Sequence, residues 1–220
     1  MLQREPDVAG SYQYFLNDEL SEIEERWQVW ETGQSQRICS TRRAPGVALS
    51  VDAVAQRGVV REFEVMWRPA KGAEIVASYR LAAGGFTYSR HVAGAVDEAG
   101  EGIEQPVVFY PLMRIFTGRV IQAVAHSGGE ALVIVPSVSG GDASPPLLAP
   151  DPDMRRVSRC EELNWPEPGP TPERLSRWQF MGGQYDANAR FWLDERGLLV
   201  RYQWQQGADQ HWDVLMVENQ

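Results

Sequence analysis

The residues that could move protons or bind a metal are few and poorly grouped. The chain has three histidines, His91, His126 and His211, and none of them lies at a spacing typical of a metal site. In "ADQHWDV", Asp209, His211 and Asp213 share one face of an expected strand. Such carboxylates could make the imidazole a proton shuttle. The alternative, a solvated polar face on an edge strand, is the interpretation that we favour.

Nucleophiles and nucleotide-binding motifs give no stronger signal. Ser89 and His91 share a face of "YSRHV", but no third group completes a catalytic set and no G-x-S-x-G motif occurs. The glycine pairs of "GGFTYSR" and "MGGQYD" match neither a dinucleotide-binding motif nor a P-loop. Cys39 and Cys160 have no Cys or His at ligand spacing, and we expect free thiols rather than a disulfide. The sequence therefore predicts no cofactor and no metal.

Carboxylates gather near the start of the chain. They are Asp18, Glu19, Glu22, Glu24 and Glu25. A glycosidase-type acid pair would need two carboxylates on facing segments at a defined separation, which one short run does not provide. We expect instead an exposed, charged hairpin edge that discourages strand addition.

Aromatic residues carry more information than the titratable ones. Tryptophan is large, stiff and amphipathic, and it suits the walls of apolar pockets. The eight tryptophans are Trp27, Trp30, Trp67, Trp165, Trp178, Trp192, Trp204 and Trp212. The arginines among the expected strands are Arg80, Arg90, Arg114, Arg190 and Arg201. An apolar molecule with an acidic end would fit an apolar cavity with one arginine at its mouth.

The elements that must position these side chains are predominantly strands. Short runs such as "VALSVDAVAQ" and "VVREFEVMWR" alternate apolar and polar residues, and turn signals recur about every 8–12 residues. No long helical pattern separates them. The sequence therefore predicts a mainly β fold: one domain over residues 1–220, with a single large curled antiparallel sheet (a β-roll or half-barrel) and one short helix.

Four stretches interrupt this pattern. Residues 93–105 are acidic and Gly-rich and predict a loop. Residues 111–117 predict a short helix, with a strand from Val120 onwards. The proline-rich residues 139–153 predict a loop, because each proline removes a donor from a strand ladder. The pair Gly182-Gly183 predicts a bulge or a sharp bend.

The terminal stretch "QYDANARFWLDERGLLVRYQW" predicts strands of a meander, each with one apolar face and an opposite face that is polar with occasional large aromatic residues. One face could surround a cavity, or it could simply pack against another sheet, and the sequence leaves both possibilities open. The candidate ligand-binding residues are Tyr185, Phe191, Arg201, Tyr202, Trp204, Trp178 and His211. We expect the 111–117 and 139–153 segments near the entrance.

Charge and hydropathy limit the possible partners. The formal net charge is −9, which argues against nucleic acid. No apolar run reaches the roughly 18 residues that a membrane span needs, and the first residues lack an export signal, so we expect a cytoplasmic protein. The sequence gives no indication of oligomeric state.

The strand rhythm resembles bacterial all-β carriers in which a curled antiparallel sheet wraps a lipid cavity. The stretches that carry this resemblance are "GSYQYFLNDELSEIEERWQVW", "EIVASYRLAAGGFTYSR" and "FWLDERGLLVRYQW". The carriers are the lipoprotein-localisation proteins and a glycolipid-binding family. The resemblance implies a lipid-binding curled sheet, and it transfers no residue role.

Three hypotheses follow. The first is a protein that binds an apolar or amphipathic small molecule, lipid or polyketide-like, inside the curled sheet. The second is an enzyme of secondary metabolism (a cyclase, isomerase or hydrolase) in which Tyr185, Arg201 or His211 transfers protons. The third is a protein-interaction module that uses an exposed aromatic face.

Overall fold

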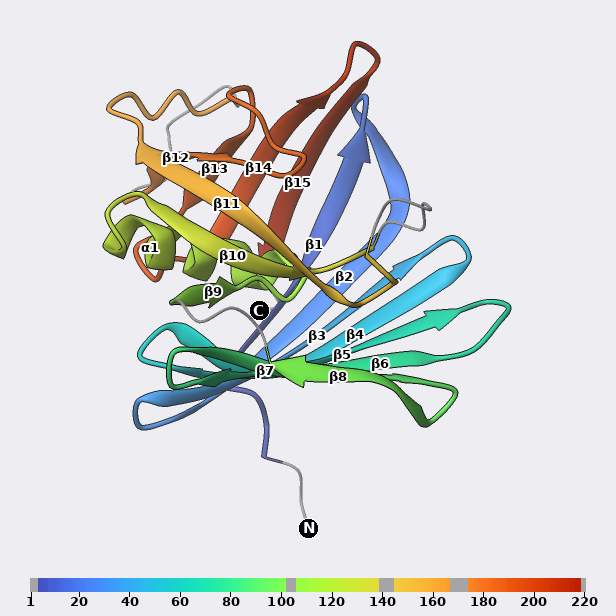
Figure 1. Ribbon diagram of the computed structural model, residues 1–220. Coiled ribbons are helices and arrows are strands. Elements are labelled where there is room, and N and C mark those ends of the chain that lie inside the picture. Colours follow the sequence, from blue (N-terminus) through green and yellow to red (C-terminus); the bar gives the residue numbers. More distant parts are fainter. Residues whose placement is uncertain (1–3, 102–105, 139–144, 167–173, 219–220) are drawn as a thin grey trace.

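A single 15-stranded sheet dominates the computed structural model, which describes residues 4–101, 106–138, 145–166 and 174–218 (Figure 1). The strand order is β8-β7-β6-β5-β4-β3-β2-β1-β15-β14-β13-β12-β11-β10-β9. Strands that are neighbours in this order pair antiparallel, including β1 with β15, and the exception is the parallel pair of β9 and β10. The predicted mainly β fold with one large curled antiparallel sheet is therefore confirmed.

The strands in chain order are β1 (Val8–Leu16), β2 (Glu19–Thr32), β3 (Ser35–Ala44), β4 (Val47–Gln56), β5 (Val59–Pro69), β6 (Ile75–Ala82), β7 (Gly85–Val92), β8 (Ala95–Glu101), β9 (Val107–Phe109), β10 (Glu130–Pro136), β11 (Pro150–Arg159), β12 (Ser176–Met181), β13 (Arg190–Leu193), β14 (Leu199–Gln206) and β15 (Gln210–Glu218). The helical elements are the 3₁₀ turn η1 (Arg114–Phe116) and the helix α1 (Thr117–His126).

The two ends of the sheet face each other without closing into a barrel. The ring of Phe109 in β9 packs edge-on against Phe63, Tyr79 and Phe86 of β5, β6 and β7, with centroids 5.3–6.0 Å apart. The strand order nevertheless ends at β8 and β9, which are not paired with each other. Ring packing, rather than a strand ladder, therefore holds the curl across this seam.

The segment 145–149 reinforces the seam. The hydroxyl of Tyr79 donates to the carbonyl of Leu148 at 2.5 Å, and Nε of Arg90 donates to the carbonyl of Leu147 at 2.7 Å. These bonds tie the chain just before β11 to strands β6 and β7, which lie more than fifty residues earlier. The segment thus crosses from one end of the curled sheet to the other.

The interior face of the last strands is aromatic. Residues directly opposite in neighbouring strands point to the same side of a sheet. One interior row consists of Trp178, Phe191, Tyr202, Val214 and Tyr14. Within this row, the rings of Phe191 and Tyr202 stack with their centroids 5.2 Å apart.

The outer face of the same strands carries both apolar and charged side chains, and residues 163–165 cover part of it. The indole N–H of Trp192 donates to the carbonyl of Leu163 at 2.9 Å, and Trp165 packs edge-on against Trp192. The guanidinium of Arg201 lies over the Trp165 ring, 5.4 Å from its centroid. Phe191 and Trp192 are adjacent in sequence and both buried because each side of this sheet has its own cover.

Two predicted loops are partly strand. The edge strand β8 covers residues 95–101 of the predicted 93–105 loop. Small and charged residues such as those of this stretch are compatible with an edge position. Residues 102–105 lie outside the described residues. Within the predicted 139–153 loop, β11 begins at Pro150. Pro150 and Pro152 pair with β10 on one side only, since the β12 pairing starts at Arg156. Prolines are tolerated there because that part of β11 has one open edge.

The helix differs most from the sequence prediction. Instead of a helix at 111–117 followed by a strand at Val120, η1 and α1 extend the helical region to His126. Val120, Ile121 and Val124 are β-branched, but they are buried on one helical face together with Thr117. Burial of that face therefore outweighs the intrinsic strand preference of these residues.

Gly118 permits the close approach of α1 to the sheet. A Cβ at this position would overlap the carbonyl oxygen of Gly197, in the turn between β13 and β14, and would lie 3.2 Å from a Leu193 methyl group. The backbone of Gly118 is in an ordinary conformation, so the glycine is required for space rather than for a positive φ. The helix position thus depends on a missing side chain.

Two further features bear on the sequence expectations. Both Cys39 and Cys160 are free, half-buried thiols, as expected. Among the described residues, no helix is long and apolar enough to span a membrane.

We predict that Gly118→Ala destabilises the chain by about 1–3 kcal/mol through overpacking. Helix propensity alone predicts the opposite sign, a gain of about 1 kcal/mol. Urea unfolding followed by circular dichroism distinguishes the two. Gly100→Ala in edge strand β8 is the control, because its Cβ would approach no closer than 3.3 Å to the Tyr88 ring. Equal effects of the two substitutions would contradict the packing argument.

Candidate functional site

A cavity of about 650 Å³ opens between the first strands of the sheet and the β10–β11 hairpin. Its apolar wall consists of Ile23, Ala44, Val47, Leu49, Trp67, Leu112, Val135, Pro136, Val138 and Pro152. Its polar wall consists of Arg42, Tyr110, Arg114, Ser137, Asp151, Asp153, Arg155, Gly183, Gln184 and Tyr185. Both kinds of side chain come from the segments 110–114, 135–138 and 151–155.

The register of β1 to β5 sets one side of the cavity. Tyr12, Glu25, Arg42, Leu49 and Trp67 stand opposite one another in successive strands, so they form a second interior row. The row begins with polar residues and ends with apolar ones. Arg42, Leu49 and Trp67 of this row line the cavity, so the wall changes from polar at Arg42 to apolar at Trp67.

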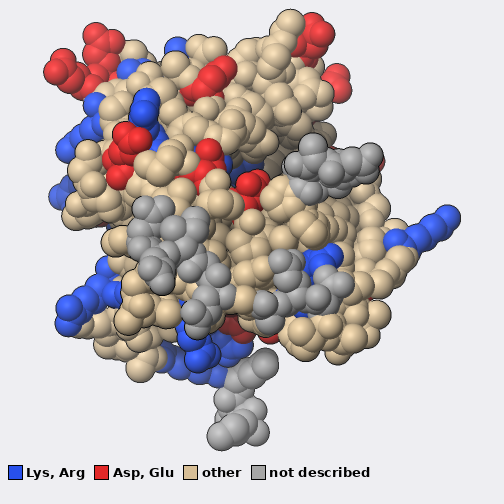
Figure 2. Space-filling model, in the orientation of Figure 1, with Lys and Arg blue, Asp and Glu red and all other residues tan. Residues whose placement is uncertain are grey.

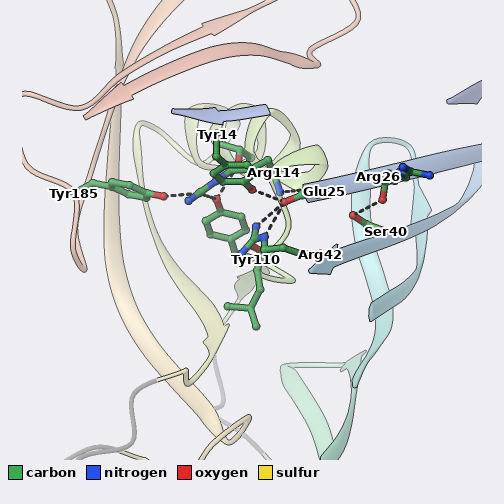
Figure 3. Close-up of polar contacts among 10 residues, drawn as sticks. Tyr14, Glu25, Arg26, Ser40, Arg42, Tyr110, Arg114 and Tyr185 are labelled. Atoms are coloured by element: carbon green, nitrogen blue, oxygen red, sulfur yellow. Dashed lines mark hydrogen bonds and ion pairs between the residues drawn. The ribbon is translucent and has the colours of Figure 1, made fainter. Parts of the chain in front are cut away.

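Glu25 is fully buried, which corrects the expected exposed hairpin edge. Its Oε2 accepts hydrogen bonds from the Tyr14 hydroxyl at 2.5 Å and from the Arg42 guanidinium at 2.7 and 2.9 Å, and its Oε1 accepts the backbone N–H of Arg114 at 2.6 Å (Figure 3). The buried carboxylate therefore joins β1, β2 and β3 to the start of η1. Arg42 extends this link through its bond to the Leu112 carbonyl at 2.9 Å.

Arg114 reaches from η1 towards the tyrosines of the second half of the chain. Its Nη1 donates to the Tyr185 hydroxyl at 2.6 Å and to the Tyr110 hydroxyl at 3.2 Å (Figure 3). The guanidinium also lies over the Tyr202 ring, 4.7 Å from its centroid. Among the described residues no carboxylate forms an ion pair with Arg114, and its buried Nε has no hydrogen-bond partner.

The glycine pair of "MGGQYD" places Arg155 and Tyr185. Gly182 and Gly183 both have positive φ, and a bridge joins Gly182 to Tyr185, so the expected sharp bend is present. The buried Arg155 donates to the carbonyl of Gly182, and a Cβ at Gly183 would overlap its guanidinium. Arg155 also forms an ion pair with Asp153 at 2.7 Å, although its N–H is not aligned with the carboxylate oxygen.

The polar wall shifts the pKa values of Tyr185 and Tyr110 in opposite directions. Burial would raise the pKa of Tyr185, but the charge and hydrogen bond of Arg114, with Gln184 and Arg155, outweigh burial and leave this pKa below its ordinary value. Burial and the neighbouring Tyr185 raise the pKa of Tyr110 to about 12, against the opposing effect of Arg114. Tyr185 is thus the phenol of this pair that ionises more readily.

The seven candidate ligand-binding residues lie in different surroundings. Tyr185 lines the cavity, from a turn rather than from the expected strand. Phe191, Tyr202 and Trp204 are buried in the aromatic packing around the Tyr185 ring, with Phe191 and Trp204 each 5.4 Å from it. Trp178 is half-buried, and its indole N–H donates to Ser176.

Arg201 and His211 are outside the cavity wall. Arg201 is on the outer face, where its Nε donates to Asp213 at 2.9 Å. His211 is half-buried near the start of β15, opposite Gln205, and its backbone N–H donates to Asn17. Asp213 is engaged by Arg201 and by Gln203, so the possible Asp-His-Asp ladder does not act as one group. The solvated edge strand that we favoured is wrong as well, because β15 pairs with both β1 and β14 and Asp213 is buried.

Sequence reasoning missed Glu25, Arg42, Tyr110 and Arg155 as site residues. For Glu25 a signal existed, because it shares the strand face of Ile23 and Trp27. For the others no local pattern distinguishes a wall residue from a surface residue. Within the part of the chain that the structure describes, no group of three or more His, Cys, Asp or Glu side chains could hold a metal ion.

Comparisons with known proteins add little to this picture. No protein-family model matches the sequence, and no curated protein matches it. A crystal structure with a similar fold is that of a β-barrel-like protein from Brucella abortus that belongs to a domain family of unknown function. The two chains are 9% identical, the alignment covers 96% of each, and the TM-score is 0.47.

We predict that Glu25→Gln lowers the free energy of unfolding by about 3 kcal/mol, because it leaves the partly buried Arg42 without its counter-ion. The matched control is Glu24→Gln, one residue earlier on the other strand face, where the side chain is 66% exposed and its ion pair with Arg26 is 3.9 Å long. Chemical denaturation of both variants measures the difference. If Glu24→Gln were as damaging as Glu25→Gln, the buried network would not be the cause.

We also predict that Tyr185 ionises at lower pH than a tyrosine in an unfolded chain. A pH titration of absorbance at 295 nm should show an early phenolate step that Tyr185→Phe removes and that Tyr202→Phe retains, since burial holds the pKa of Tyr202 above its ordinary value. Because the pKa of Tyr185 is lower in the folded state, its ionisation should add stability as pH rises from that value towards about 10. An unchanged early step in Tyr185→Phe would contradict the assignment.

Proposed function

We propose that the chain binds an amphipathic small molecule, lipid or polyketide-like, in the 650 Å³ cavity. The observation that carries this proposal is that one cavity combines many apolar side chains with a hydrogen-bonded group of arginines and tyrosines. Ligand sites of small molecules are mostly apolar hollows with a few convergent polar groups, and their volumes are about 300–1,000 Å³. The cavity fits this description in size and in chemistry.

The apolar wall suits a flexible hydrocarbon body. Val47, Leu49 and Trp67 come from β4 and β5, and Val135 faces them from β10. A body held between these strands would remove apolar surface from water, which provides the main gain on binding. The large indole of Trp67 adds contact area with little loss of side-chain freedom.

Residues from the 111–117 and 139–153 segments, which we expected near an entrance, line the cavity. Leu112 and Arg114 of one segment, and Asp151 and Asp153 of the other, belong to the wall. Val138 is half exposed and also lines the cavity, so an apolar side chain stands where the wall meets solvent. A ligand entering here would meet an apolar surface first and the arginines further along the polar wall.

The alternative function is an enzyme that uses the same cavity. The observation that favours it is that the pKa of Tyr185 is lowered while the pKa of Tyr110 is raised. Pairs of titratable groups with divergent pKa values are typical of acid–base sites. In this hypothesis Tyr185, rather than Arg201 or His211, would act as the base of a cyclase, isomerase or hydrolase. Turnover that Tyr185→Phe abolishes while ligand binding persists would favour this alternative.

Other partners receive less support. The net charge of −9 disfavours the phosphates of nucleic acid. The exposed large apolar side chains of the described residues are dispersed over separate elements, which does not favour a protein-interaction module. They are Leu20, Val96, Val138, Met154 and Val217.

We predict that cis-parinaric acid, a fluorescent fatty acid, saturates the protein at one molecule per chain and accepts energy from Trp67 in the cavity wall. Val135→Trp should weaken this binding at least tenfold, because the larger side chain fills the cavity. Val217→Trp, at an exposed position of β15, is the matched control and should bind as the parent chain does. Equal affinity of the two variants would show that the probe binds elsewhere and would refute the proposal.

A further inference from the structure

The three arginines of the cavity wall differ in how their charge is balanced. Arg42 forms an ion pair with the buried Glu25 at 2.7 Å, and Arg155 forms one with Asp153 at 2.7 Å. Three guanidinium groups therefore face two paired carboxylates, which leaves one positive charge, that of Arg114. The remaining acid of the wall, Asp151, is exposed to solvent, which screens its charge.

The contacts of Arg114 are those of a cation that lacks an anion. Its side chain donates to two tyrosine hydroxyls, and Glu25 bonds to its backbone N–H rather than to its guanidinium. Arginine remains charged in proteins, and a buried charge without a counter-ion is costly. One buried donor, Nε, is still unused by any described residue.

We propose that the ligand carries a single carboxylate and that Arg114 binds it at the polar wall of the cavity. This inference rests on the proposed function and adds the class of head group to it. A carboxylate matches a guanidinium in shape and can accept two of its N–H groups. One negative charge also balances the one positive charge that the wall leaves over.

A ligand carboxylate would compete with the Tyr185 phenolate for the Arg114 guanidinium. The Tyr185 hydroxyl is the closest hydrogen-bond partner of the Arg114 guanidinium, at 2.6 Å. A phenolate at Tyr185 and a ligand carboxylate would both be anions competing for the same cation. Binding of the carboxylate therefore returns a proton to Tyr185 whenever the phenol has ionised.

The groups that face Tyr185 come from several elements. Arg114 of η1 and Arg155 of β11 favour its anion, and Gln184 adjoins it in the same turn. Tyr110, which follows β9, and Tyr202 of β14 are phenols whose pKa values are raised, so they remain neutral where Tyr185 ionises. Proton uptake on binding is therefore assigned to Tyr185.

The first test compares decanoate with decanol by calorimetry and by displacement of cis-parinaric acid. The two probes share one hydrocarbon chain and differ in the head group. Decanoate should bind at least tenfold more tightly than decanol. If decanol binds as well as decanoate, the carboxylate assignment is overturned while the proposed function stands, and if neither probe binds, the proposed function itself fails.

The second test uses Arg114→Met, which keeps much of the side-chain bulk and removes the charge. It should lose the preference for decanoate over decanol and still bind decanol, whereas Arg80→Met, at an exposed arginine of β6, should keep the preference. A retained preference in Arg114→Met would overturn the proposal. Should this variant fail to fold, the next measurement decides without it.

The third test measures proton uptake when decanoate binds, in buffers of different ionisation enthalpy. Above the midpoint of the early absorbance step, the parent chain should take up a proton and its absorbance at 295 nm should fall, whereas Tyr185→Phe should bind decanoate without either change. Binding of decanoate by the parent chain without proton uptake would contradict the competition for Arg114.

Discussion

The buried carboxylate of Glu25 is the contact on which the cavity depends. It is fully enclosed, and its three kinds of partner come from β1, from β3 and from the backbone where η1 begins. A charge in this position is tolerated because the Arg42 guanidinium pairs with it and both carboxylate oxygens accept hydrogen bonds. The arrangement fixes the 110–116 segment against the sheet interior and thereby orients the Arg114 side chain. On the face shown in Figure 2, by contrast, charged side chains of both signs lie in solvent, where such pairs contribute little.

The second half of the chain completes the wall by a different device. Gly182 and Gly183 allow the backbone to wrap closely around Arg155, and the bend brings Tyr185 to the cavity from outside any strand. The aromatic rings of β12 to β14 then hold the Tyr185 ring from behind. A rigid phenol, a buried guanidinium and a tight turn therefore act as one unit. The polar wall is assembled from distant parts of the sequence that the bond between Arg114 and Tyr185 and the contact of Arg114 with the Tyr202 ring bring together.

Much of the scaffold was predictable from the sequence, and little of the site was. Alternation with period two predicted the strands, the curl and the terminal meander, and strand parity placed Phe191 and Tyr202 on one interior face. The α1 segment was missed because Val120 and Ile121 prefer strands, whereas burial of one helical face decides their conformation. Glu25 was assigned to the surface because acidic residues usually lie there. Its partners Arg42 and Arg114 are 17 and 89 residues away, and no local pattern reveals such pairing.

The unpaired seam between β8 and β9 has a mechanical consequence. In the described part of the chain, the two ends of the sheet are held by the ring contacts of Phe109 and by the clasp of residues 145–149 on β6 and β7. Edge-to-face ring contacts contribute only about 0.5–1.5 kcal/mol each beyond their buried area, so a small displacement of one end of the sheet weakens these contacts but breaks no strand ladder. A closed barrel has a circumference fixed by its hydrogen bonds. Between the described strands β8 and β9 no such ladder forms, so the curvature of this sheet depends on side-chain packing at the seam.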